Sequence, residues 1–315
     1  MKRITILTPV YNDWECLRQL CIRLNSLAER NSYCLRIIAV NDGSSISMPT
    51  DVCVGGTSLC IQSVEVIELH CNLGHQRAIA VGLTEVARRD DQDLIVVMDS
   101  DGEDNPDDIA GLIRLHEENP NDIILAQRAK RSEGMPFIMF YWIYRQMFYG
   151  LTGYRISFGN FSLIPSRFVH NLIHSPSLWS SLSAAILRSH IPLVLYPTVR
   201  AQRFLGTSKM NFTALVLHGL KAISVFGETV IIRLSIIVFT MVLITLSAVL
   251  CLRLFTDLLV PGYTSEIIGI LFIIVLQVGT MLGGMGLLLL HNNSVMPMIP
   301  AIHAKSFIRT IIQLR

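Results

Sequence analysis

Short apolar runs alternate with amphipathic stretches through the first 130 residues of the chain. Runs of aliphatic and β-branched residues predict strands, and apolar positions recurring every three to four residues predict helices. The strands are expected at Ile4–Leu7, Leu35–Val40, Val64–Leu69, Leu94–Met98 and Ile123–Ala126, and the helices at Trp14–Leu27, Gln76–Ala87 and Pro106–Glu117. This alternation is typical of an α/β fold with a mostly parallel sheet and helices on both faces.

Two much longer apolar runs follow in the last third of the chain. Leu234–Leu252 holds 19 residues and Ile267–Leu290 holds 24, and neither run contains a charge. A helix needs about 20 apolar residues to cross a bilayer. We therefore expect transmembrane helices at 230–254 and 267–290, and these runs account for the high mean hydropathy of +0.49.

The basic residues predict the orientation in the membrane. The linker Phe255–Glu266 carries no Lys or Arg, whereas Lys305, Arg309 and Arg315 lie in the tail. By the positive-inside rule, the domain at 1–210 and the tail at 291–315 are cytoplasmic. Because the N-terminus leads directly into a strand pattern, we expect no signal peptide. The protein is expected in the plasma membrane if the source is bacterial.

Two further segments are expected to form helices at the membrane surface. Residues 136–151 hold seven aromatic side chains, a composition that suits the membrane interface, although a core helix with an aromatic stripe would show the same pattern. A juxtamembrane helix is expected at 211–229. Gly279 and Gly283 form one G-x-x-x-G pair in the second apolar run, which favours close helix packing and a homo-oligomer.

Composition excludes several classes of function. The net charge is +2 and no basic stripe is present, so we expect no nucleic-acid partner. The seven cysteines form no C-x-x-C pair, and free thiols are expected. No histidine spacing typical of a metal site, no G-x-G-x-x-G and no P-loop pattern is found.

The strongest chemical signal is an acidic cluster after the fourth predicted strand. The apolar run Leu94–Met98 is followed by Asp99, Asp101, Glu103 and Asp104. Ligands of α/β sheets bind beyond the carboxyl ends of strands, and clustered carboxylates repel unless a cation neutralises them. Oxygen ligands suit Mg²⁺ or Mn²⁺ bridging to substrate phosphates. An acidic turn that caps the next helix is the alternative.

Four other polar segments complete a recognisable set. They are Thr8-Pro-Val-Tyr-Asn-Asp13, Val40-Asn-Asp-Gly-Ser-Ser45, Asn72-Leu-Gly-His-Gln-Arg-Ala78 and Arg203-Phe-Leu-Gly-Thr-Ser-Lys209. In this order and with the acidic cluster, they resemble the motifs of inverting family 2 glycosyltransferases with the Rossmann-like GT-A fold. The chain is most similar to polyprenyl-phosphate glycosyltransferases, which include dolichyl-phosphate mannose synthases.

The resemblance implies a donor site and a metal site. The nucleotide would be bound by Pro9, Tyr11, Asp42, Arg77 and Asp99. The metal would be held by Asp99 and Asp101, with Glu103 as a third ligand. From the residues alone, Asp42 could instead shape an Asx-turn, and Arg77 could be an ordinary surface arginine.

The resemblance also implies sites for two phosphate groups. Arg128 and Arg131, after the fifth strand, would bind the acceptor phosphate, because a guanidinium matches phosphate geometry. Arg203, Ser208 and Lys209 would close over the diphosphate. Catalysis is thus expected to depend on Asp99, Asp101, Arg128 and Arg203. A solvated loop at Arg131 and contacts of the last loop with anionic headgroups are the alternatives.

Several positions depart from the family's usual motifs. Asn41 replaces the first Asp of D-D-G-S, Asp13 replaces Glu, His75 replaces Lys, Glu103 replaces Gln and Asn105 replaces Pro. Gly159-Asn-Phe-Ser162 stands near the usual F-R-L.

The resemblance implies transfer of a sugar from a UDP- or GDP-sugar to undecaprenyl or dolichyl phosphate at the cytoplasmic membrane face. The protein would then be a metal-dependent hexosyltransferase whose product serves the modification of a glycan or surface polysaccharide. Two alternatives are considered. The protein could be a family 2 transferase that uses another lipid acceptor such as diacylglycerol, or it could be a non-catalytic membrane scaffold subunit.

Overall fold

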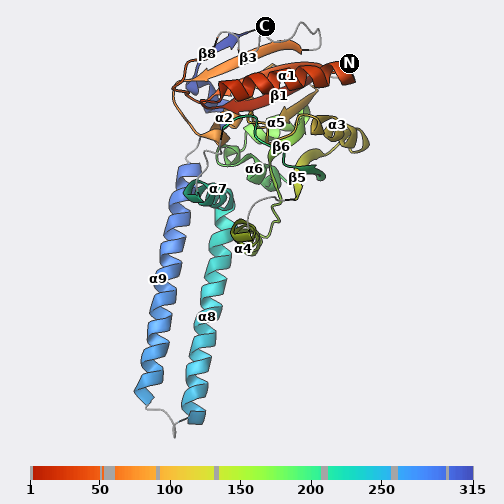
Figure 1. Cartoon of the computed structure of the whole chain (residues 1–315). Coiled ribbons are helices and arrows are strands. Elements are labelled where there is room, and N and C mark those ends of the chain that lie inside the picture. Colours follow the sequence, from red (N-terminus) through yellow and green to blue (C-terminus); the bar gives the residue numbers. More distant parts are fainter. Residues whose placement is uncertain are drawn as a thin grey trace.

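The computed structural model describes residues 3–49, 52, 61–89, 93–130, 135–206, 212–256, 262–295 and 298–314. A sheet with helices on both faces lies at one end of a long helical hairpin, and both chain termini lie at the sheet end (Figure 1). This division matches the apolar pattern of the sequence, in which the long uncharged runs all follow the α/β region.

Within the described residues, eight strands form one mixed sheet in the order β7-β5-β6-β4-β1-β2-β3-β8. They are β1 (Arg3–Val10), β2 (Cys34–Asn41), β3 (Ile61–Leu69), β4 (Leu94–Val97), β5 (Ile123–Lys130), β6 (Phe158–Pro165), β7 (Leu193–Val199) and β8 (Ile308–Gln313). The neighbours β4, β1, β2 and β3 are parallel, whereas β6 runs antiparallel to β4 and β5. The carboxyl ends of β4, β1, β2 and β3 therefore meet at one edge, where the predicted site segments follow.

Helices cover both faces of the sheet. They are α1 (Trp14–Asn31), α2 (His75–Ala87), α3 (Asp108–Glu118), α5 (Ser166–Ile173), the short 3-10 helix η1 (Pro176–Trp179) and α6 (Leu182–Arg188). Side chains alternate across a strand, so Ile6 of β1 packs with α1 and α3 on one face, and Leu7 packs with α2, α5 and α6 on the other. The two resulting cores hold the strand ends rigidly in place.

The α/β prediction is confirmed. All five predicted strands and all three predicted helices are present, although the helix expected from Pro106 begins at Asp108. Strands β6, β7 and β8 and helices α5 and α6 were not predicted, because their short apolar stretches give no clear periodicity.

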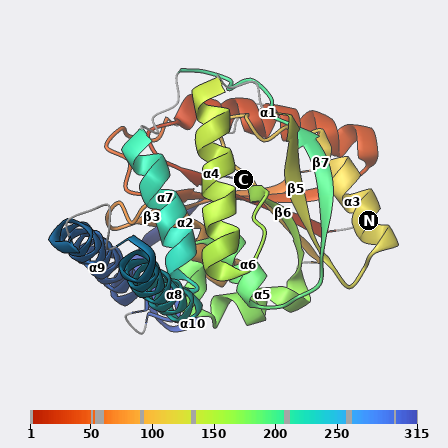
Figure 2. The ribbon, with the colours of Figure 1, turned by 90° about the horizontal axis from the view of Figure 1, so that it is seen from below.

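Four helices make up the region next to and within the hairpin. They are α4 (Met135–Thr152), α7 (Phe212–Ser224), α8 (Gly227–Thr256) and α9 (Gly262–Val295). Helices α4 and α7 lie across the lower side of the domain, at the base of the hairpin (Figures 1 and 2). Phe148, Ala222, Ile223 and Val230 join α4, α7 and α8 in a third buried cluster.

Two segments of the hairpin are long and apolar enough to cross a membrane, Gly227–Ser247 and Gly269–Leu288. Only 6% and 0% of the residues in their most apolar windows are buried. A core helix of a water-soluble domain would be mostly buried, so these outward-facing apolar surfaces favour lipid as their surroundings.

The C-terminal segment returns to the domain. After α9, the short helices α10 (Pro300–His303) and η2 (Ala304–Phe307) lead into β8, which pairs antiparallel with β3. The segment expected as a simple tail at 291–315 thus completes one edge of the sheet.

Candidate active site

The acidic loop after β4 is tied together by its own carboxylates. Asp104 accepts a hydrogen bond from the Asp99 backbone N–H at 3.0 Å, and Asp101 accepts one from the Glu103 N–H at 3.0 Å. Gly102 has a φ of +89°, a conformation that side-chain-bearing residues rarely adopt. The tight turn holds Asp99 and Asp101 at the carboxyl edge of the sheet.

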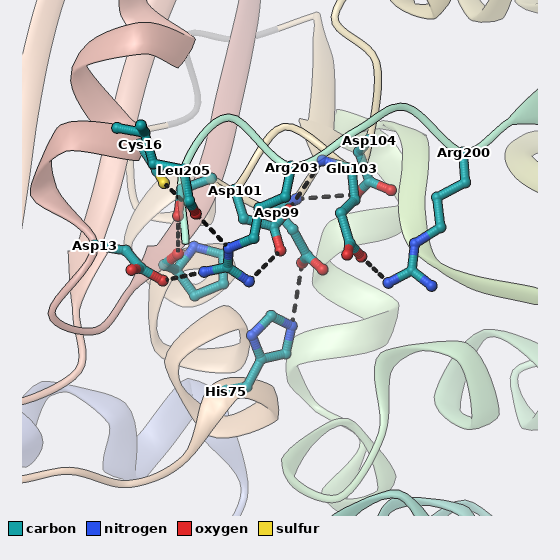
Figure 3. A network of polar contacts seen from close by, with 12 residues as sticks. Asp13, Cys16, His75, Asp99, Asp101, Glu103, Asp104, Arg200, Arg203 and Leu205 are labelled. Atoms are coloured by element: carbon teal, nitrogen blue, oxygen red, sulfur yellow. Dashed lines mark hydrogen bonds and ion pairs between the residues drawn. The ribbon is translucent and has the colours of Figure 1, made fainter. Parts of the chain in front are cut away.

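A second loop, residues 200–206 after β7, closes over the first (Figure 3). Its Ala201 N–H donates to the Glu103 carbonyl at 3.0 Å, and its Phe204 N–H donates to the Asp101 carbonyl at 2.8 Å. The Phe204 ring lies directly on Gly102, where an added Cβ would come within 2.6 Å of the ring. The backbone bonds and this contact lock the two loops together.

Arg203 joins three parts of the chain. Its guanidinium lies 3.1 Å from an Asp101 oxygen and 2.6 Å from an Asp13 oxygen, and it also donates to the Leu205 carbonyl at 2.9 Å. The Arg203 side chain is 13% exposed, so these charge-assisted bonds are largely shielded from water. The predicted diphosphate-binding arginine therefore lies at the acidic loop.

Glu103 points to a different partner, the guanidinium of Arg200. Among the described residues, no three His, Cys, Asp or Glu side chains gather closely enough to hold a metal ion. Asp99 and Asp101 lie in the same loop, close enough for the charge of Asp99 to act on Asp101. Glu103 as a third ligand stays a prediction.

The surroundings of Asp101 disfavour its charged form. Burial, together with the charges of Asp99 and Glu103, raises the pKa of Asp101 despite the nearby Arg203. Two carboxylates held close in this way are stabilised by added positive charge. They suit a divalent ion that takes one or two protein carboxylates and completes its shell with water and substrate phosphate.

His75, the residue in place of the family's lysine, contacts Asp99. Its Nε2 lies 3.3 Å from Asp99 Oδ1 and 3.0 Å from the Asn160 amide nitrogen. Burial opposes the charged imidazolium, but the carboxylates of Asp99, Asp104 and Asp42 outweigh that effect and raise the pKa of His75. The substitution therefore keeps a group that can carry positive charge beside the predicted metal ligand.

The side-chain amides of Gln76 and Asn160 form a hydrogen-bonded chain that orients this histidine. Gln76 accepts a hydrogen bond from the Leu182 N–H at 2.8 Å and donates to the Asn160 side-chain oxygen at 3.0 Å. Asn160 then directs its amide nitrogen at His75 Nε2, which accepts that hydrogen bond only in the neutral ring, whereas the charged ring would donate from Nε2 to Asp99. Asn160 belongs to the segment Gly159-Asn-Phe-Ser162, so this departure from the family pattern has a structural role.

In the turn after β2, Asn41 and Asp42 both accept backbone hydrogen bonds, and the Asx-type turn considered for Asp42 is formed by Asn41 instead. Asp42 is buried and accepts hydrogen bonds from the Leu73 and Gly74 N–H groups at 2.7 and 3.0 Å. Asn41 forms the Asx-type turn by accepting from the Ser44 N–H at 3.0 Å. Asp42 thus shapes the loop that leads into α2, and its contact with a nucleotide base stays a prediction.

The other predicted nucleotide-binding residues lie at the same edge of the sheet. Pro9 is the residue before the last of strand β1, and its carbonyl accepts a hydrogen bond from the Ser100 hydroxyl at 3.3 Å. Tyr11 follows β1 and is 43% exposed. Arg77, on the first turn of α2, has its guanidinium carbon 5.8 Å from the centre of the Trp179 ring.

The predicted acceptor residues are described only in part. Arg128 lies near the end of β5, where its backbone pairs with Thr198 of β7. Arg131, Ser208 and Lys209 lie outside the described residues.

Comparison with known proteins agrees with this arrangement. The family model described as "Glycosyl transferase family 2" matches residues 5–171, more than half of the chain. The chain belongs to glycosyl transferase family 2. The matched region includes the acidic loop, His75 and Asn160, and it ends before the Arg203 loop.

Curated relatives and a solved structure add detail. The chain is 30% identical over 135 residues to an undecaprenyl-phosphate 4-deoxy-4-formamido-L-arabinose transferase of Yersinia pestis (strain Pestoides F), and 29% identical over 133 residues to the Serratia proteamaculans (strain 568) enzyme of that name. These matches cover 43% and 42% of this chain, and only 39% of each relative's length.

The structure also resembles glucosyl-3-phosphoglycerate synthase of Mycobacterium tuberculosis, solved with Mn²⁺, UDP-glucose and phosphoglyceric acid. The TM-score is 0.51 at 13% identity, with 73% of this chain and 80% of that chain covered. This likeness shows the fold, which is GT-A.

Sequence reasoning missed several residues of the site. Asp13, His75 and Asn160 were noticed only as departures from family motifs, and Arg200 was not noticed at all. Asp13 and His75 lie inside recognisable motifs, so their positions were a usable signal. Nothing local marks Arg200, because its partner Glu103 is 97 residues away.

Proposed function

We propose that this protein transfers a sugar, with inversion, from a nucleotide-sugar donor to a polyprenyl phosphate at the membrane surface. The observation that carries the proposal is the position of the Asp99–Asp101 loop. It lies at the carboxyl edge of a GT-A sheet whose lower side is bordered by α4, α7 and the apolar hairpin (Figure 1). The names of the curated relatives, which act on undecaprenyl phosphate, support this acceptor class.

Asp99 and Asp101 would hold Mg²⁺ or Mn²⁺. Asp99 and Asp101 lie in one loop, and burial together with the Asp99 charge disfavours the charged form of Asp101, so the pair fits an ion that shares its shell with a diphosphate. When bound, the ion would offset the negative charge that develops on the leaving diphosphate. The Mn²⁺ of the similar mycobacterial synthase is consistent with such a requirement.

The protein's own cations would stabilise the same charge. Arg203 already spans from Asp13 to Asp101, so its guanidinium lies where a diphosphate bound to this loop would approach. With Ser208 and Lys209, it would hold the leaving group by charge-assisted hydrogen bonds. His75 beside Asp99 would orient that carboxylate.

The chemical step needs little acid–base help. A phosphate oxygen of the acceptor forms a bond to the anomeric carbon, and the bond from that carbon to the diphosphate breaks. Its electron pair leaves with the nucleoside diphosphate. Since a phosphate monoester is already anionic near neutral pH, positioning and electrostatics would supply most of the acceleration.

The membrane-facing elements would bring the acceptor to this centre. One side of α4 presents the exposed apolar side chains of Met139, Trp142, Ile143 and Met147, which suit the headgroup region. With α8 and α9 in the bilayer, the phosphate of a membrane lipid would lie at the same level along the membrane normal as the proposed reaction centre. Arg128 and Arg131 would meet it, and the protein would work as a membrane-bound homo-oligomer.

Sugar transfer in detergent tests the proposal. Purified protein is incubated with Mg²⁺ or Mn²⁺, a panel of UDP- and GDP-sugars, and either undecaprenyl phosphate or diacylglycerol. One donor that yields a metal-dependent, mild-acid-labile product on undecaprenyl phosphate is the expected result. Transfer to diacylglycerol but not to undecaprenyl phosphate would show that the acceptor is a diacylglycerol lipid and that the proposed acceptor class is wrong. Neither transfer nor Mn²⁺-dependent nucleotide binding would point to a non-catalytic scaffold.

A further inference from the structure

The C-terminal end of α4 is held by an arginine of α8. Arg233 Nη1 donates to the backbone carbonyls of Tyr149 and Gly150 at 3.3 and 3.0 Å. Its guanidinium also lies against Gly153, where an added Cβ would come within 2.6 Å of Nη2. The carbonyl groups at the C-terminus of a helix carry a partial negative charge, so a guanidinium is a favourable partner. Arg233 therefore fixes the end of α4 beside the first apolar span.

A second arginine contacts the same helix end. The guanidinium carbon of Arg155 lies 5.2 Å from the centre of the Tyr149 ring, which is a cation–π contact. Arg155 and Arg233 therefore contact one residue, Arg155 through its ring and Arg233 through its carbonyl. Arg155 is exposed and Arg233 is half-buried, so two cations lie together at an accessible edge of the molecule.

A third arginine borders this pair. Arg188, the last residue of α6, is exposed and donates to the carbonyl of Val225, between α7 and α8. The ring of the next residue, Phe226, packs on the ring of Tyr154 with centroids 4.9 Å apart. Because Tyr154 directly precedes Arg155, this ring contact joins Arg188 to the other two arginines.

Few carboxylates balance these charges. Residues 135–157, 182–192 and 212–241, which form α4, α6, α7, the first half of α8 and their connections, carry five Lys or Arg and one Asp or Glu. The single carboxylate is Glu228, exposed in the first turn of α8. Within the described part of the chain, no carboxylate forms an ion pair with Arg155, Arg188 or Arg233. This edge of the molecule is therefore positively charged.

The position of Arg233 sets the level of the membrane surface. Arg233 lies within the candidate span Gly227–Ser247, but the uncharged run begins only at Leu234. A charged side chain in the hydrocarbon is costly, so the boundary between headgroups and hydrocarbon is expected close to Arg233. Its bonds hold the end of α4 at that level, and Trp142, exposed on α4, suits the same region.

We infer that Arg155, Arg188 and Arg233 form a surface that binds the phosphates of anionic phospholipid headgroups in the leaflet next to the domain. This inference rests on the membrane placement in the proposed function, and not on the sugar transfer. A guanidinium matches a phosphate with two parallel N–H bonds, and each cation near an anionic leaflet adds attraction. The surface would hold α4 and the domain at one depth relative to the bilayer.

Quenching of tryptophan fluorescence by brominated lipids tests this surface without turnover. Of the three tryptophans, Trp142 is exposed on α4, whereas Trp14 and Trp179 are buried in the domain. The full chain is placed in phosphatidylcholine vesicles that contain either brominated phosphatidylglycerol or brominated phosphatidylcholine. The ratio of the two quenching curves measures the preference for the anionic lipid. The wild type should prefer phosphatidylglycerol, and the preference should fall as ionic strength rises.

Arg155→Gln and Arg233→Gln are each expected to lower this preference by up to about fivefold, the effect of one cation near an anionic surface. Arg155→Lys should keep most of it. The matched control is Arg167→Gln on α5, because Arg167 is also exposed, donates to the Pro120 carbonyl and lies over the Phe168 ring. Helix α5 lies at the level of the sheet (Figure 1), so this variant should behave as the wild type.

Thermal unfolding of each variant checks that it is folded. If Arg233→Gln unfolds because α4 loses its bonds to α8, Arg155→Gln still tests the surface, since its guanidinium contacts only a ring. Quenching by neither lipid would show that the hairpin is not inserted, and both the membrane placement and this inference would fall.

Four further outcomes would overturn the inference alone. They are equal quenching by both lipids in the wild type, an unchanged preference in the folded glutamine variants, an equal loss in Arg167→Gln, and displacement of phosphatidylglycerol by a few mole per cent of farnesyl phosphate. The last result would assign the surface to the acceptor lipid. If the preference is present but no sugar is transferred, the proposed reaction falls and the headgroup surface stands.

Discussion

At the scale of single residues, the site is a set of carboxylates each held by a cation from a distant segment. Asp101 contacts Arg203, Glu103 contacts Arg200, and Asp99 contacts His75. The acidic loop would be unfavourable alone, because its charges repel. Its partners hold it in shape, and the two aspartates at its start would contact the donor.

Replacing either predicted metal ligand should abolish most activity. Asp99→Asn and Asp101→Asn remove charge but keep size, and each should lower turnover roughly 100-fold or more because the diphosphate loses its stabilisation. Initial rates at saturating donor measure the effect, and circular dichroism checks folding. Asp107→Asn, which removes a carboxylate in an exposed pair with Arg30, serves as control. Normal rates in both variants would make the metal assignment wrong.

Gly102 should resist substitution for a steric reason. Gly102→Ala places a Cβ against the Phe204 ring at a φ of +89°, which should cost roughly 1–3 kcal/mol and separate the Arg203 loop from Asp101. We expect a lower turnover and a lower melting temperature. Gly150→Ala, in open space on α4, should leave both unchanged, and wild-type behaviour of Gly102→Ala would show that the loops are not locked.

Binding of a divalent ion should stabilise the protein more at higher pH. Burial and Asp99 raise the pKa of Asp101, so this group's contribution to the stability of the metal-free protein is complete below the ordinary aspartate pKa and is lost as pH rises through the raised pKa. Protons also compete with the ion for the carboxylate. The increase in melting temperature caused by Mn²⁺ with UDP should therefore be larger at pH 7 than at pH 4.5, closer to the ordinary aspartate pKa, and absent in Asp101→Asn. An equal increase at both pH values would argue against this carboxylate as a ligand.

At the scale of elements, the C-terminal strand completes the sheet. Strand β8 pairs with β3 from Glu65 to Leu69, and it covers an edge that would otherwise present unpaired backbone groups. Ile308 packs against one core and Leu314 against the other. A short segment after the hairpin thus contributes to both faces of the domain.

Removing this strand should destabilise the domain. Deletion of residues 308–315 loses the pairing and three partly buried apolar side chains, those of Ile308, Ile312 and Leu314, at a cost of roughly 3 kcal/mol, and should promote aggregation through β3. Thermal unfolding and size-exclusion chromatography measure both effects. Thr310→Ala, which keeps the backbone of an exposed position, is the control. An unchanged melting temperature on deletion would mean that β8 adds no stability.

At the scale of the whole molecule, the return of the chain to its first sheet constrains the topology. The domain and β8 lie at the same end of the hairpin, and the end of α8 and the start of α9 lie at the other (Figure 1). If both spans cross a bilayer, the site and the C-terminal strand share one side. The positive-inside pattern predicts that this side is the cytoplasm.

Labelling of cysteines by an impermeant maleimide checks this orientation. In right-side-out vesicles, a cysteine introduced by Ser265→Cys, in the first turn of α9 at the far end of the hairpin, should react. Exposed Cys71 of the domain should react only after permeabilisation. The positive-inside bias is the physical reason. Labelling of Cys71 alone would reverse the topology, and labelling of both in sealed vesicles would contradict insertion.

Local pattern was enough to predict much of this protein. Short apolar runs and helical periodicity predicted the alternation through β5, and two long uncharged runs predicted the hairpin, because each depends on neighbours in sequence. Motifs at strand ends predicted the family and the positions of Asp99, Asp101 and Arg203. They did so because parallel strands bring their carboxyl ends to one edge.

Only the tertiary structure decided which distant groups meet. Arg203 and Asp13 are 190 residues apart, and Leu182 and Gln76 are 106 apart; no local pattern links such pairs. The pairing of β8 with β3 and the turn of Glu103 to Arg200 depend on the packing of the whole chain. Sequence by itself determined the elements and the chemistry available, and long-range packing decided how that chemistry is arranged.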